Sequence, residues 1–116
     1  MTPTPTEVQA ILTMYIHMPD TPSRHRSADR RLAIDLHTRQ VPIEVIESAF
    51  LLASVRRFYR HPDRPALAPI RSLAYFIPTI DELLRQPLPA GYLQYLRGKL
   101  ARVHNHHQTE SLLLNV

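Results

Sequence analysis

Prolines divide this chain at places where helices would begin or end. The 116 residues contain 11 prolines but only two glycines, and most prolines lie between stretches whose apolar residues recur at helical spacing. Proline is accepted in the first turn of a helix and disrupts a helix interior. Tight β-hairpins usually need Asn-Gly, Asp-Gly or Gly-Gly pairs, and none of these pairs occurs. The sequence therefore predicts an all-α protein.

Three helices are predicted in the first half of the chain. The first begins at Thr6, which forms a capping-box pattern with Gln9, and it ends near Met18 because a proline follows. The second begins with Ser27 as its N-cap. The third begins at Pro42 and should be central, since apolar residues cover much of its circumference. The predicted apolar stripe of the second helix consists of Ala28, Leu32, Ala33 and Leu36.

Two further helices are predicted in the second half. The first has one apolar face spaced by three and four residues, formed by Ile70, Leu73, Ile77, Ile80 and Leu84. Pro78 lies within this pattern, so we predict a continuous but kinked helix, with a break into two helices as the alternative. The last helix begins at about Gly91, with Leu93, Leu96, Leu100 and Val103 on one side. Residues 1–116 should thus form one small bundle of about five helices with short, proline-rich connections, in which residues 108–116 could be a flexible tail.

The chain lacks the usual sequence signals of an enzyme. It has no cysteine, no Gly-x-Ser-x-Gly motif and too few glycines for a phosphate-binding loop. The histidines His104, His106 and His107 cluster late in the chain without partners at metal-ligand spacing, so we interpret them as a solvated helix end. We therefore expect no catalytic residues, no metal site and no cofactor.

Two carboxylate pairs have the spacing that acid–base catalysis could use. Glu44 and Glu47 lie one helical turn apart, and Asp81 and Glu82 are neighbours. Both pairs fall on the polar side of amphipathic helices, so we interpret them as solvated faces.

Arginine dominates the positive charge, with 13 arginines against the single lysine Lys99 and a net charge of +4. One arginine-rich segment contains Arg56, Arg57, Arg60, Arg64 and Arg71, with Tyr59 and Tyr75 beside them. A second cluster contains Arg24, Arg26, Arg30 and Arg31. Arginine grips phosphate through two nitrogens, and exposed aromatic rings stack on bases. These residues predict a nucleic-acid-binding surface, while a GC-rich genome and solubilised helix ends are the competing explanation.

Protein binding is the main alternative function. Apolar helix faces could form an adaptor, a homo-oligomer or a small subunit of a larger complex, and the size and charge also suit helical subunits of CRISPR interference complexes. The leucines of residues 112–114 are a candidate contact strip.

Two segments carry a resemblance to a known family. Residues 41–50 read VPIEVIESAF, and residues 70–77 read IRSLAYFI. Over residues 27–84 the order of elements resembles the helical domain of bacterial and phage replication accessory proteins of the DnaD type. The resemblance implies a non-catalytic helical module that binds DNA and replication partners, with Tyr75 at the matching aromatic step as a partner-facing or core residue. The arginine-rich loop of residues 61–69 and Pro78 depart from the family pattern.

The remaining expectations concern location. The first residues lack the basic and apolar regions of a secretory signal, and no apolar run is long enough to cross a membrane. We therefore expect a cytoplasmic, soluble protein without a membrane partner.

Overall fold

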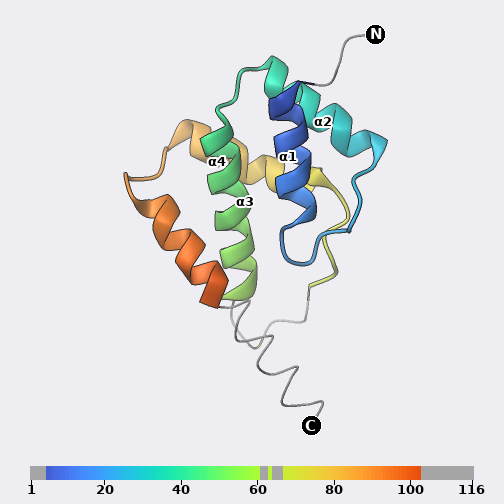
Figure 1. Cartoon of the computed structure of the whole chain (residues 1–116). Helices are drawn as coiled ribbons and strands as arrows, with labels where there is room; N and C mark the ends of the chain where they lie inside the picture. Colours follow the sequence, from blue (N-terminus) through green and yellow to red (C-terminus); the bar gives the residue numbers. More distant parts are fainter. Residues whose placement is uncertain (1–4, 61–62, 64–66, 103–116) are drawn as a thin grey trace.

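A computed structural model describes residues 5–60, 63 and 67–102 of the chain. These residues form helices and no strand, so the predicted all-α class is confirmed (Figure 1). The helices are α1 (Thr6–Ile16), α2 (Ser27–Thr38), α3 (Ile43–Phe58) and α4 (Ile77–Arg85). A short 3₁₀ helix, η1 (Leu73–Phe76), leads directly into α4, and a further helix covers residues 92–102.

Helix α3 is the central helix, as the sequence predicts. Every residue from 49 to 55 is buried, which an amphipathic surface helix would not allow. Helix α3 contacts α1, η1 and α4, and Figure 1 shows the helix of residues 92–102 beside it on the opposite side from α1 and α2. Its C-terminal turn therefore lies where several segments meet.

Three aromatic rings form the middle of the core. Phe76 packs against Phe50 with ring centroids 4.7 Å apart, and against Tyr15 edge to face at 6.2 Å. All three side chains are fully buried. Such aromatic contacts add to the burial of apolar area, so these rings join α1, α3 and η1 into one core.

The predicted caps of the first two helices are wrong. Pro5 is the N-cap of α1, and Thr6 is the first helical residue without a capping side-chain bond. Ser27 is likewise the first helical residue of α2, and Arg26 precedes it as the N-cap. The backbone N–H of Arg26 donates to Asp29 at 2.8 Å. A buried carboxylate one turn into the helix therefore takes the capping role that the sequence pattern assigned to a hydroxyl.

The buried face of α2 also differs in part from the prediction. Ala33 and Leu36 are fully buried as expected, whereas Leu32 is half-buried and Ala28 is exposed. Asp29 takes a place in this face with 1% of its surface exposed. The start of α2 thus turns a charged residue, and not alanine, towards the core.

The predicted continuous helix over residues 70–84 is wrong, and the alternative of a break is closer to the structure. Ser72 accepts a bond from the N–H of Ala74 and starts η1, while Pro78 falls in the first turn of α4, where its missing N–H is tolerated. A 3₁₀ helix turns about 120° per residue against about 100° in an α-helix. This extra rotation explains why Leu83 is buried and Leu84 is 41% exposed.

The helix of residues 92–102 begins one residue after Gly91, close to the predicted start. Leu96 is fully buried in the common core, and Leu93 and Leu100 pack against it as partly buried residues. Val103, the last member of the predicted stripe, lies outside the described residues.

Candidate nucleic-acid interface

The C-terminal turn of α3 carries the first of the arginines predicted to bind nucleic acid. Arg56 and Arg57 lie in this last turn, where positive charge complements the helix dipole. An open pocket of about 350 Å³, which we call the arginine pocket, is lined by Ala53, Arg56, Arg57, Arg60, Leu67, Tyr75 and Thr79. The structure therefore brings together four of the predicted site residues, which are Arg56, Arg57, Arg60 and Tyr75.

Arg56 is paired with a carboxylate on α4. Its two terminal nitrogens donate to the two oxygens of Glu82, at 2.7 and 3.0 Å. These hydrogen bonds raise the pKa of Arg56 and lower the pKa of Glu82. The side chains of Arg56 and Glu82 remain 55% and 40% exposed, so the pair lies at the surface of the pocket.

Arg57 is held inside the structure. Its side chain is only 6% exposed, and it donates to Asp20 at 3.1 Å and to the carbonyl oxygen of Ala68. Its guanidinium carbon lies 5.6 Å from the centre of the Tyr75 ring. Desolvation opposes the charge of Arg57, but hydrogen bonds to Tyr75 and Asp20 outweigh it and the pKa of Arg57 is raised. Arg57 therefore ties α3 to two loops.

Tyr59 does not line the arginine pocket. Tyr59 is 51% exposed as a residue, and the ammonium group of Lys99 lies 4.3 Å from the centre of its ring. Lys99 also lies 5.7 Å from the ring centre of Tyr95. Tyr59 thus belongs to a separate cation–aromatic contact between the end of α3 and the last described helix.

Two long-range bonds bring the second arginine cluster towards Arg71. The N–H of Leu73 donates to Asp29 at 2.9 Å, and the N–H of Ile70 donates to the carbonyl oxygen of Asp20 at 2.8 Å. These bonds place the backbone of Arg71 beside the start of α2. Arg30, Arg31 and Arg71, which lie on these two segments, are each exposed. Sequence spacing could not have indicated this proximity, since the two segments are far apart in the chain.

Some predicted residues lie outside the described residues. These are Arg64 and the histidines His104, His106 and His107, together with the tail of residues 108–116.

Three of the four carboxylates in the two pairs form ion pairs with arginines, and the fourth, Glu44, is exposed. Glu47 pairs with Arg97 of the last described helix, and Glu82 pairs with Arg56. Asp81 lies 3.8 Å from Arg39, a longer contact. In the part of the chain that the structure describes, no three His, Cys, Asp or Glu side chains are grouped so that they could hold a metal ion.

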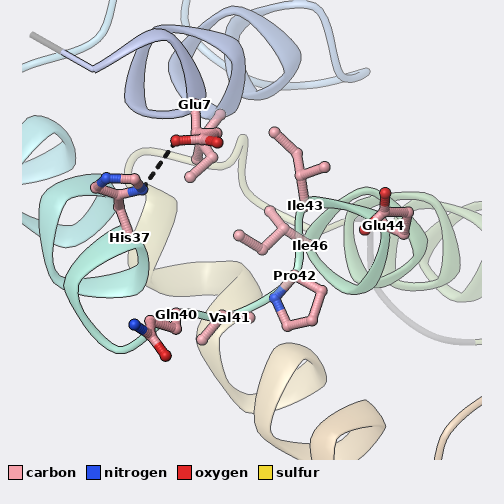
Figure 2. Close-up of a pocket in the computed structure, with 9 residues that line it drawn as sticks. Glu7, His37, Gln40, Val41, Pro42, Ile43, Glu44 and Ile46 are labelled. Carbon is pink, nitrogen blue, oxygen red and sulfur yellow. Dashed lines mark ion pairs between the residues drawn. The ribbon is translucent and has the colours of Figure 1, made fainter.

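A second pocket was missed by the sequence analysis. It has a volume of about 390 Å³ and lies where α1, the end of α2 and the start of α3 meet (Figure 2). At one side of it, Nδ1 of His37 lies 3.3 Å from a carboxylate oxygen of Glu7, and Gln40 adopts a left-handed φ of 59° in the turn between α2 and α3. Its apolar lining comes from Ile11, Val41, Pro42, Ile43 and Ile46. No local pattern marks this pocket, because Glu7 reaches it from a different helix.

The comparisons with known proteins give no relative for this fold or site. No family model, curated protein or solved structure matches the chain. Among the helices that the structure places, none combines the length and apolar character that crossing a bilayer requires.

Proposed function

We propose that this chain is a non-catalytic helical module that binds nucleic acid through the arginine pocket. One observation carries the proposal, which is that three arginines and a half-exposed tyrosine share one open pocket. Guanidinium groups bind phosphate oxygens through charge-assisted hydrogen bonds, and they prefer two-point contacts. The resemblance to DnaD-type domains points to the same class of ligand.

The arginines of the pocket have different roles in this proposal. Arg56 and Glu82 form an exposed pair, and such pairs are weak because water screens them, so a phosphate can replace the carboxylate. Arg57 is enclosed and tied to Asp20, so it supplies fixed charge and holds Tyr75. Substituting Arg57 would therefore disturb the fold, whereas substituting Arg56 tests binding.

The wider surface adds contacts beyond the pocket. Arg71 and the start of α2 with Arg30 and Arg31 contribute exposed side chains on adjoining segments. If about four arginines neutralise phosphates, a plot of the logarithm of the affinity for duplex DNA against the logarithm of the salt concentration should have a slope of about −4. Sequence preference should be slight, because phosphate contacts carry no base information.

Two opposite substitutions in one ion pair test the proposal. Arg56→Ala should weaken binding and flatten the salt slope by about one, because one phosphate contact is lost. Glu82→Gln should strengthen binding about threefold to tenfold, because it releases Arg56 from its carboxylate partner. Fluorescence anisotropy with labelled duplex and single-stranded oligonucleotides at several salt concentrations measures both effects.

The Glu47–Arg97 pair provides the matched control. Glu47→Gln changes the net charge as much as Glu82→Gln does, but its partner Arg97 lies on the last described helix and does not line the arginine pocket. If both glutamine variants strengthen binding equally, only net charge matters and the pocket is not the site. If the wild-type protein binds no DNA or RNA at low salt, the proposal fails and the protein-adaptor interpretation takes its place.

A further inference from the structure

We propose that the arginine pocket takes single-stranded nucleic acid, with an unpaired base stacked on Tyr75 and the adjoining phosphate on Arg56. The inference rests on the proposed function and names the class of ligand that the site accepts.

Tyr75 has the position of a stacking platform. Tyr75 is 40% exposed as a residue, although the neighbouring Phe76 is fully buried. Phe76 contacts the Tyr75 ring edge to face, with centroids 5.2 Å apart and an angle of 82°. Arg57 lies over the ring at 5.6 Å and is itself held by Asp20. The ring is therefore fixed by two neighbours while the residue remains partly exposed, so little side-chain freedom is lost when a base stacks on the ring.

The combination of ring and cations favours an unpaired strand over a duplex. In a duplex each base is already stacked on its neighbours, so a protein that contacts only the backbone gains nothing from Tyr75. Proteins that bind single strands combine a positively charged groove with aromatic side chains on which bases stack. The arginine pocket has both features within about 350 Å³, a volume within the range of small-ligand sites.

The other exposed tyrosines do not share this environment. Tyr95 is 48% exposed, comparable to Tyr75, and it lies near Lys99 on the last described helix. It does not line the arginine pocket. Tyr95 is therefore a matched control for the loss of an exposed tyrosine.

The experiment compares Tyr75→Leu, Tyr75→Phe and Tyr95→Leu with the wild type. Fluorescence anisotropy is measured with a labelled oligothymidine strand of about twelve nucleotides and with a duplex of equal length, at one low salt concentration. Tyr75→Leu should weaken single-strand binding about tenfold, because one base–aromatic stack is lost, and should weaken duplex binding much less, because the bases of a duplex stay stacked on one another. Tyr75→Phe keeps the ring and should retain single-strand binding, as should Tyr95→Leu.

The outcomes separate this inference from the proposed function. If strand and duplex bind equally well and Tyr75→Leu affects neither, the stacking inference is overturned while nucleic-acid binding stands. If neither ligand binds the wild type, both proposals fail.

A second measurement uses the wild-type protein alone, in case Tyr75→Leu does not fold. Photocrosslinking with a strand that contains 5-iodouracil should attach the base to Tyr75, which peptide mass spectrometry can locate. Crosslinks confined to other tyrosines would overturn the inference.

Discussion

Tyr15 is fully buried, and its hydroxyl has no hydrogen-bond partner among the residues that the structure describes. Burial raises the pKa of this hydroxyl to about 12, and the negative charge of Asp29 adds to the effect while Arg26 opposes it. The ring stabilises the core through its contact with Phe76, whereas the hydroxyl is buried at a cost.

Tyr15→Phe should therefore leave stability unchanged or raise it by up to about 1 kcal/mol at pH 7, because an unpaired buried hydroxyl is removed. The raised pKa means that the folded protein binds the Tyr15 proton more tightly than the unfolded chain does. The stability that this proton contributes is therefore complete below pH 10 and is lost as the pH rises towards 12. A rise of the pKa from 10 to about 12 corresponds to roughly 2 to 3 kcal/mol of unfolding free energy. The wild type should lose this stability at high pH, whereas Tyr15→Phe should keep it.

Urea unfolding of both proteins at about pH 8, pH 10 and pH 11.5 would measure this difference in the free energy of unfolding. Tyr95→Phe, at an exposed position, is the control and should follow the wild type at every pH. A loss of more than about 1 kcal/mol in Tyr15→Phe at pH 7 would mean that the hydroxyl has a partner.

At the scale of the elements, Asp29 joins α2 to η1. One carboxylate oxygen accepts the N–H of Arg26 at 2.8 Å, and the other accepts the N–H of Leu73 at 2.9 Å. The same residue thus caps α2 and fixes the start of η1, from which Tyr75 projects. Together with the backbone bond from Ile70 to Asp20, this side chain holds the segment that contains Arg71 beside the start of α2.

Asp29→Ala should destabilise the protein by about 2 to 6 kcal/mol, because two backbone N–H groups lose their acceptor and each loss costs about 1 to 3 kcal/mol. Asp29→Asn retains one acceptor oxygen and should cost less. Asp35→Ala, on the exposed side of α2, is the control and should cost less than about 0.5 kcal/mol. Chemical unfolding followed by circular dichroism measures all three, and equal stability of Asp29→Ala and Asp35→Ala would contradict this role.

At the scale of the whole molecule, the helix of residues 92–102 belongs to the common core. Leu96 is 1% exposed, and Arg97 pairs with Glu47 across to α3. Residues of α3 also line the arginine pocket, so the stability of α3 matters to the pocket and to the contact with the last described helix.

Leu96→Ala should lower the free energy of unfolding by about 2 to 5 kcal/mol and should shift one cooperative transition. Leu84→Ala, at a residue 41% exposed, should cost much less. Thermal unfolding monitored by circular dichroism tests both variants. A separate early transition in Leu96→Ala would show that the last described helix unfolds independently of the rest.

The sequence by itself determined the all-α class, the central place of α3 and the approximate limits of the helices. Each of these properties depends on local features, which are the helical period of the apolar residues and the positions of the prolines. Both features affect the backbone only within a few residues along the chain. The prediction failed where a local pattern had two solutions. A proline such as Pro78 suits both a kinked helix and the first turn of a new one, and only the packing of Phe76 and Leu83 against α3 selects between them.

The tertiary structure alone decided which predicted site residues share a surface. It enclosed Arg57, paired Arg56 with Glu82, placed Tyr75 in the arginine pocket and set Tyr59 against Lys99. These partners are separated in the chain by loops and whole helices. The energy of an ion pair or a ring contact depends on distance and burial in space, and neither quantity is encoded by the spacing of residues along the sequence.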